Sequence, residues 1–190
     1  AGAIFQGLFR NPMADPYVIG VSSGAALGAV LAILAQQISG LSLTYGVPGL
    51  AFLMAVLTIV VVYRLAQSGG KAPVMTLLLA GIAVNSLLSA LVSLCMYYSG
   101  SQMHQLVFWL MGGFSGRGWS YIFMFLPYAI FGALIIWIYT RELNAMLMGE
   151  EPAQHLGIDV EKVKFRLLIA AALLTGACVS VSGLIGFVGL

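Results

Sequence analysis

The charged residues of this chain are concentrated in one segment, residues 140–166. The whole sequence has 8 Lys or Arg residues and 6 Asp or Glu residues. Nine of these lie in the segment: Arg141, Glu142, Glu150, Glu151, Asp159, Glu161, Lys162, Lys164 and Arg166. Such side chains can cap helices and form ion pairs, and their spacing indicates which of these they do.

The spacing predicts a short helix, a sharp turn and the start of a second helix. Glu150 and Glu151 precede Pro152, and proline is favoured at the first position of a helix. Acidic groups there suit the positive end of the helix dipole. Gly157 fits the left-handed position that ends a helix, and Asp159 can cap the helix that follows.

From spacing alone, two interpretations of this segment stay open. It can be a well-capped, solvated connector. It can also be a docking element for another protein, because the short turn is expected to expose the apolar side chains of Ala153 and Leu156. The residues that would carry such docking are Glu150, Glu151, Ala153, Leu156 and Gly157.

A second pattern is a stripe of small or mildly polar residues in the apolar stretch 74–98. Gly81, Asn85, Ser89 and Ser93 recur at intervals of four, which predicts that they share one helix face. Burying the amide of Asn85 in lipid without a partner would cost several kcal/mol, so it should face protein or water. A hydrogen bond between helices and the lining of a transport pathway are both compatible with this pattern.

The apolar stretches lack the side chains that membrane enzymes and ion-coupled carriers use. No Asp, Glu, His, Lys or Arg lies in their interior, whereas such residues mark proton relays and active sites in membranes. Cys95 and Cys178 lie in apolar runs without metal-ligand spacing, which is typical of packing residues. We therefore predict no catalytic residue, no metal site and no cofactor in this part of the chain.

The composition requires a lipid environment. Hydrophobic residues make up 61% of the chain and charged residues 7%, against about 25% charged residues in a soluble domain. In lipid the backbone must satisfy its own hydrogen bonds, and long unbroken apolar runs favour helices over barrel strands. We predict an all-α, polytopic transmembrane helix bundle in which residues 1–190 form part of one domain. Its five complete spans are expected near 17–37, 47–65, 74–98, 119–139 and 165–185.

Positive charge predicts the orientation of these spans. Alternation of the spans places 10–16, 64–73 and 140–166 on one side of the membrane, and 38–46 and 99–118 on the other. The first side holds every Lys and Arg except Arg117. It is therefore expected to be cytoplasmic.

The net charge of +2 is too small to indicate nucleic-acid binding. Small residues at Gly20, Gly24 and Gly28 predict close helix packing in the first complete span.

The motifs of the chain together resemble the FecCD family, the permeases of ATP-binding-cassette importers for iron-siderophores, haem and cobalamin. The matching segments are Gly2-Ala3 with Gln6, 10–16, 20–25, 79–83, 108–113, 149–157, and Ser182-Gly183 with 186–190. They occur in the family's order over the whole length. The resemblance implies a type II importer permease fold, of which this chain would be a fragment covering roughly the second to seventh helices.

The resemblance also implies partners and sites. A family permease forms a homodimer in the lipid of the cytoplasmic membrane, with cytoplasmic ATP-binding subunits that hydrolyse ATP and an extracytoplasmic substrate-binding protein. Residues 149–157 match the helix that docks on the ATP-binding subunit, and 74–98 matches a helix that lines the pathway. Arg117 is a candidate contact for the binding protein. The alternative function, an ion-coupled secondary transporter or channel, would require ionisable groups within the spans.

Overall fold

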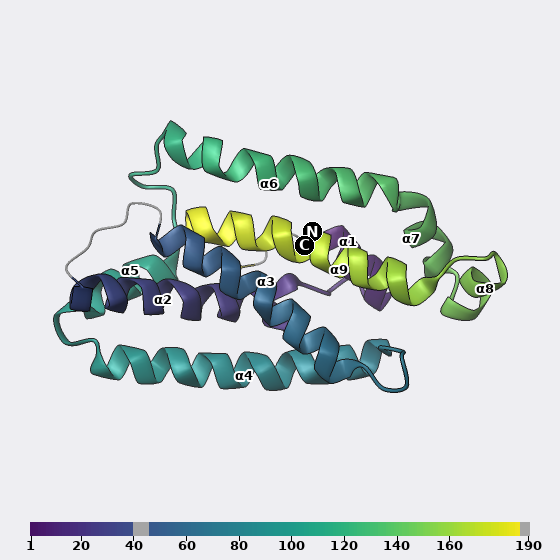
Figure 1. Cartoon of the computed structure of the whole chain (residues 1–190), viewed down its shortest axis with the longest axis horizontal. Helices are drawn as coiled ribbons and strands as arrows, with labels where there is room; N and C mark the ends of the chain where they lie inside the picture. Colours follow the sequence, from purple (N-terminus) through teal and green to yellow (C-terminus); the bar gives the residue numbers. More distant parts are fainter. Residues whose placement is uncertain (40–45, 187–190) are drawn as a thin grey trace.

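The computed structural model describes residues 1–39 and 46–186. In these ranges the elements are α-helices and short 3-10 helices, without a strand (Figure 1). Their bounds are α1 Gly2–Phe9, η1 Pro16–Ile19, α2 Val21–Ser39, α3 Gly46–Ala66, α4 Val74–Tyr98, η2 Gly100–Gln102, α5 Met103–Met111, α6 Trp119–Ile138, α7 Thr140–Leu147, α8 Glu150–His155 and α9 Val160–Ser182.

Five of these helices form an elongated bundle. Within the described ranges, α2, α3, α4, α6 and α9 are long and apolar enough to cross a membrane. Figure 1 shows them along the long axis of the molecule, with α3 and α9 in the middle and α4 and α6 at opposite flanks. This arrangement confirms the predicted all-α transmembrane bundle.

The ends of two helices differ from the expected spans. The span expected to begin at residue 17 is preceded by η1, in which the Asp15 carboxylate accepts the N–H of Tyr17 at 2.8 Å. Gly20 ends η1 with φ 81°, so α2 starts at Val21. The last long helix begins at Val160, before the expected residue 165, because Asp159 caps it. The expected outer loop 38–46 lies mostly outside the described residues, and the motif residues 187–190 lie wholly outside them.

Close packing of α2 against α3 occurs at the predicted glycines. A methyl group at Gly24 would lie 2.8 Å from the backbone oxygen of Met54, and one at Gly28 would lie 2.9 Å from Cα of Ala51. Real Cβ atoms do not approach backbone this closely, so only glycine permits this helix separation. The prediction that small residues serve packing is confirmed for Gly24 and Gly28.

The two flanking helices also approach the bundle at glycines. On α4, a methyl group at Gly81 would lie 2.8 Å from Cα of Ile19 in η1. On α6, a methyl group at Gly132 would lie 2.7 Å from Cγ of Leu174 in α9. Gly132 is the one buried residue of α6, so most of the surface of this apolar helix is available to lipid or to another protein segment.

The charged segments meet at one end of the bundle. Residues 67–73, which we name the α3–α4 turn, contact the start of α9 through a hydrogen bond from the N–H of Ala72 to Glu161 (3.0 Å). Helices α7 and α8 lie at this same end, and α5 lies at the opposite end (Figure 1). This is the alternation of sides that the positions of Lys and Arg predicted.

The orientation can be tested with single cysteines at Ser101 and Gln154, both of which are exposed. The full-length protein would carry each one in a background without Cys95 and Cys178. We expect an impermeant thiol reagent added outside intact cells to label Ser101→Cys and not Gln154→Cys, because the positive end should be cytoplasmic. Labelling of both after permeabilisation is the control, and the reverse pattern in intact cells would contradict the assignment.

Candidate functional site

The short helix α8 forms at the predicted place but begins before Pro152. Gly149 precedes it with φ 139°, and a methyl group at Gly149 would lie 2.8 Å from Cδ of Pro152. Glu150 and Glu151 therefore occupy the first helical positions, and Pro152 is the third. Proline is tolerated there because backbone N–H groups of the first turn have no partner within the helix. The acidic pair still lies at the positive end of the helix dipole.

The end of α8 is a glycine-capped turn, as predicted. Gly157 has φ 81°, and its N–H donates to the carbonyl of Gln154 at 2.9 Å. The N–H of Ile158 donates to the carbonyl of Ala153 at 3.2 Å. These two bonds form a Schellman motif, which needs a left-handed residue at Gly157. The turn thereby directs the chain from α8 into α9.

Asp159 caps α9 as predicted. Its carboxylate accepts the backbone N–H of Lys162 at 3.2 Å and pairs with the ammonium group of the same residue at 2.7 Å. These hydrogen bonds from Lys162 hold the pKa of Asp159 below its usual value. The pair is exposed to solvent, so it fixes the local turn more than it adds to overall stability.

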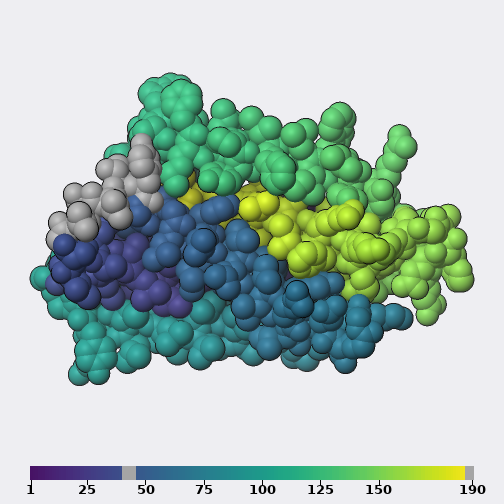
Figure 2. Space-filling view, in the orientation of Figure 1, coloured from purple at the N-terminus to yellow at the C-terminus, as the bar shows by residue number. Residues whose placement is uncertain are grey.

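The exposed surface of α8 differs from the expected one. Ala153 is fully buried beneath the helix and cannot contact another protein, which corrects the expectation that it is exposed. Leu156 is 70% exposed, and Met148 beside α8 is 79% exposed. Leu147 is also exposed, so the apolar surface is larger than the sequence suggested. Figure 2 shows that this segment forms the tip of the molecule beyond the long helices.

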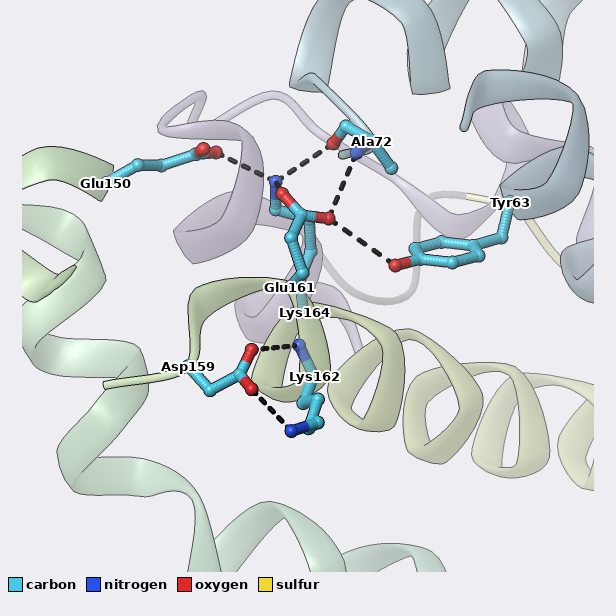
Figure 3. Close-up of polar contacts among 7 residues, drawn as sticks. All are labelled: Tyr63, Ala72, Glu150, Asp159, Glu161, Lys162 and Lys164. Atoms are coloured by element: carbon cyan, nitrogen blue, oxygen red, sulfur yellow. Dashed lines mark hydrogen bonds and ion pairs between the residues drawn. The ribbon is translucent and has the colours of Figure 1, made fainter. Parts of the chain in front are cut away.

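Lys164 is the residue of this region that the sequence prediction missed. Its side chain is 1% exposed, and its ammonium group contacts Glu150 at 3.0 Å and Glu161 at 3.1 Å (Figure 3). It also donates to the backbone oxygen of Ala72 at 2.9 Å. The ammonium group thus joins α8, α9 and the α3–α4 turn.

Glu161 extends the same network to α3. One carboxylate oxygen accepts the Lys164 ammonium, and the other accepts the N–H of Ala72 at 3.0 Å and the hydroxyl of Tyr63 at 3.4 Å. The Glu161–Lys164 spacing of three residues, following a capping Asp159, is a sequence signal for a helical ion pair. No sequence signal indicates that Ala72 or Glu150 would join it. We name Tyr63, Ala72, Glu150, Glu161 and Lys164 the Lys164 network.

The stripe on α4 does not occupy one environment. Gly81 is buried against η1, Asn85 is half-buried, and Ser89 and Ser93 are exposed. Four residues turn an α-helix about 40° past a full turn, so the stripe rotates by about 120° from Gly81 to Ser93. The expectation of a single shared face is therefore wrong over this length. Its first member serves packing, and its last two members face outward from this chain.

Arg117 is placed far from α8, in the segment between α5 and α6. It is half-buried, and its guanidinium carbon lies 4.7 Å from the ring centroid of Tyr121, a cation–π distance. It borders a largely apolar cavity of about 700 Å³, together with Tyr17 and Thr175. The side chain lies on Tyr121 instead of extending freely into solvent.

Two of the sequence motifs meet where α5 ends. The N–H of Gly113 donates to the carbonyl of Ser182 at 2.6 Å. A methyl group at Gly183 would lie 2.8 Å from Cα of Gly112. Segments 108–113 and 182–183 thus pack backbone to backbone, and they fix the end of α9 that is remote from α8.

The described residues offer contact surfaces more than reactive groups. Among them, no cluster of three or more His, Cys, Asp or Glu side chains could hold a metal ion. Cys95 and Cys178 are free thiols in α4 and α9. The candidate sites are therefore the turn around α8, the Lys164 network beneath it, the outer part of the α4 stripe, and Arg117.

Sequence comparison shows which known proteins this chain resembles. The model of the FecCD transport family matches residues 1–190. The chain is 44% identical over 190 residues to the cobalamin import system permease protein of Halobacterium salinarum, covering 100% of this chain and 50% of the relative. It is 40% identical over 196 residues to the hemin transport system permease protein of Yersinia pestis, covering 100% of this chain and 57% of the relative.

A solved structure is similar over nearly the whole chain. It is described as an inward-facing conformation of a metal-chelate type ABC transporter, with a TM-score of 0.88 and 32% sequence identity. The match covers 99% of this chain and 59% of the solved chain. The chain spans about half the length of the curated relatives it matches.

The turn after α8 can be tested with substitutions at Gly157. A methyl group there would meet no atom within 4 Å, so only the backbone angle opposes a side chain. We expect Gly157→Val to weaken the turn by about 1–2 kcal/mol or more, because β-branched residues resist positive φ. Gly157→Asn is the matched control, because Asn tolerates this conformation. Amide hydrogen exchange of Ile158 measures the effect, and equal protection in both variants would contradict the account.

Proposed function

The chain belongs to the FecCD transport family, and we propose that it forms part of the permease subunit of an ATP-binding-cassette importer. The importer moves a metal chelate of the iron-siderophore, haem or cobalamin class across the cytoplasmic membrane. ATP hydrolysis occurs on a partner subunit, so this subunit supplies the pathway and the coupling surface. The names of the relatives and of the similar structure support this substrate class.

The observation that carries the proposal is the exposed turn around α8 at the charged end of the bundle. Leu156 and Met148 project from it, although apolar side chains gain nothing from contact with water. Burial of one such side chain stabilises an interface by about 1.5–3 kcal/mol. We propose that this surface, with Glu151 at its edge, docks on the ATP-binding subunit. Glu150, Ala153 and Gly157 set its shape from beneath and behind.

The other partners follow from the remaining surfaces. A second copy of the permease would cover part of the exposed face of α4, with the pathway between the two copies. Asn85, Ser89 and Ser93 are the candidate lining residues, and the last two are exposed on this chain. An extracytoplasmic binding protein would approach the opposite end, where Arg117 is the candidate contact.

An ion-coupled secondary transporter fits the structure less well. Such a carrier needs ionisable groups within the spans. Among the described residues, the buried acidic and basic side chains are Asp15 and Lys164. Asp15 caps η1 and Lys164 is paired with two carboxylates at the start of α9. Both groups have local structural partners, so neither forms a relay along the bundle.

Docking can be tested with Leu156→Ser in the full-length permease. We expect association with the ATP-binding subunit to weaken by about tenfold, because the lost burial of one Leu corresponds to more than 1.4 kcal/mol. Co-purification and titration of the ATP-binding subunit measure this. Met111→Ser is the matched control, because Met111 is similarly exposed at the opposite end. Equal affinities for wild type and Leu156→Ser would reject docking through this surface.

The pathway can be tested with Ser89→Cys in a cysteine-free, full-length background. We expect labelling by a water-soluble thiol reagent that changes when ATP is added, because the lining of a pathway alternates in access. Leu87→Cys is the control, since it lies about 160° away around the helix and should face lipid. Ser89→Trp should block uptake while the complex still assembles. A Ser89→Cys thiol that is unreactive in every nucleotide state would exclude the pathway assignment.

A further inference from the structure

We infer that Lys164 is a positioning residue that joins the docking helix α8 to the start of the pathway helix α4. A displacement of α8 would then move the α3–α4 turn and α9 with it. This inference rests on the proposed function, in which α8 docks on an ATP-binding subunit. It deepens that proposal by naming the side chain through which the contact reaches the membrane helices.

The first argument is that the Lys164 ammonium has a partner for each of its donors. A lysine ammonium has three N–H groups. The acceptors are Glu150 of α8, Glu161 of α9 and the backbone oxygen of Ala72. Because the side chain is buried, a lost partner could not be replaced freely by water. The three segments are therefore held at one point (Figure 3).

The second argument is that α8 is held to its neighbours by short turns and by one side-chain ion pair. Glycines in unusual conformations flank it, with φ 139° at Gly149 and φ 81° at Gly157. Of the ion pairs in the described residues, only Glu150–Lys164 connects α8 to another helix. The buried methyl group of Ala153 packs against its neighbours, but an apolar contact of this kind does not fix the direction of the helix. The Glu150–Lys164 pair is thus the directional link of α8.

The third argument is the position of Ala72. Both of its backbone polar groups are engaged, since the N–H donates to Glu161 and the carbonyl accepts from Lys164. Helix α4 begins two residues later, at Val74. A shift of the Lys164 ammonium therefore acts on the residue that leads directly into α4. The connection runs from α8 through Lys164 and Ala72 to the helix that carries Ser89.

A purely structural role predicts a different behaviour. If Lys164 only stabilised the fold, its loss would lower the amount of assembled complex, and each assembled complex would work normally. If Lys164 positions α8, complexes that assemble without it would still hydrolyse ATP, but α4 would no longer move together with α8. The readouts that separate these cases are uptake per ATP hydrolysed and the distance between α8 and the α3–α4 turn.

The experiment uses the full-length permease, reconstituted with its ATP-binding subunits and binding protein, and carrying Lys164→Met. The uptake probes are cobalamin and hemin. Spin labels at Gln154 and Lys71, both exposed, report the distance from α8 to the turn with and without ATP. We expect uptake per ATP to fall about tenfold, within the usual range of coupling between sites. We expect the narrow wild-type distance distribution to broaden.

Lys162→Met is the matched control. Lys162 lies on the same helical turn, but it is exposed and pairs with Asp159 outside the Lys164 network. It should leave both readouts at the wild-type level. Glu150→Gln should act in the same direction as Lys164→Met. The double variant should be no worse than Lys164→Met alone, because Lys164→Met already removes the Glu150–Lys164 pair.

Three results would overturn the inference. The first is an assembled Lys164→Met complex with wild-type uptake per ATP and a narrow distance distribution. The second is a double variant whose effects multiply. The third result applies if the Lys164→Met complex does not assemble. In that case, wild-type uptake per ATP and a wild-type distance distribution in the Glu150→Gln complex would overturn the inference. If the wild-type complex takes up neither cobalamin nor hemin, the distance distributions alone test the inference. Failure of docking itself would be seen separately, as normal binding of the ATP-binding subunit by Leu156→Ser.

Discussion

Close approach of helix backbones is the constraint on which the arrangement of this bundle depends. In lipid, helices gain little by exchanging lipid contacts for helix contacts unless their surfaces fit closely, and small residues permit that fit. Glycines occupy the crossings of α2 with α3 and of α4 with η1, and Gly183 lies where α9 meets α5. A side chain at any of these crossings would separate the two backbones. The positions of the long helices therefore follow from where the chain has no Cβ atom.

The second determinant is the exclusion of charge from the bundle interior. Most charged groups gather at one end, where they can be solvated or paired; Asp15, buried as the cap of η1, and Arg117, between α5 and α6, are exceptions. Lys164 shows how a charge is accommodated at the boundary, because two carboxylates and a backbone carbonyl surround its ammonium group. Pairing of this kind constrains geometry more than it adds stability, since desolvation offsets much of the attraction. The network consequently fixes how α8, α9 and the α3–α4 turn lie relative to one another.

These two determinants act at opposite ends of the molecule. At the charged end, α8 is a small element held by a polar network, with Leu156 and Met148 projecting beyond it. At the other end, the chain segments around Gly112 and Gly183 pack backbone to backbone. Between them, α4 contacts the bundle through Gly81 and turns its outer polar residues away from it. A movement that begins at α8 can thus reach α4 through the turn that precedes it.

The sequence by itself determined the properties that depend on local chemistry and composition. The all-α bundle and its charged end follow from hydropathy and charge. The caps at Gly157 and Asp159 and the glycine packing of α2 follow from residue type and spacing. Tertiary structure alone decided which residues are buried. It placed Ala153 beneath α8, buried Gly81 against η1 while leaving Ser89 and Ser93 exposed, and brought Ala72 and Glu150 to Lys164. The physical reason is that burial and long-range pairing depend on how helices cross, and residues 72, 150 and 164 are neighbours only after α3, α8 and α9 have packed.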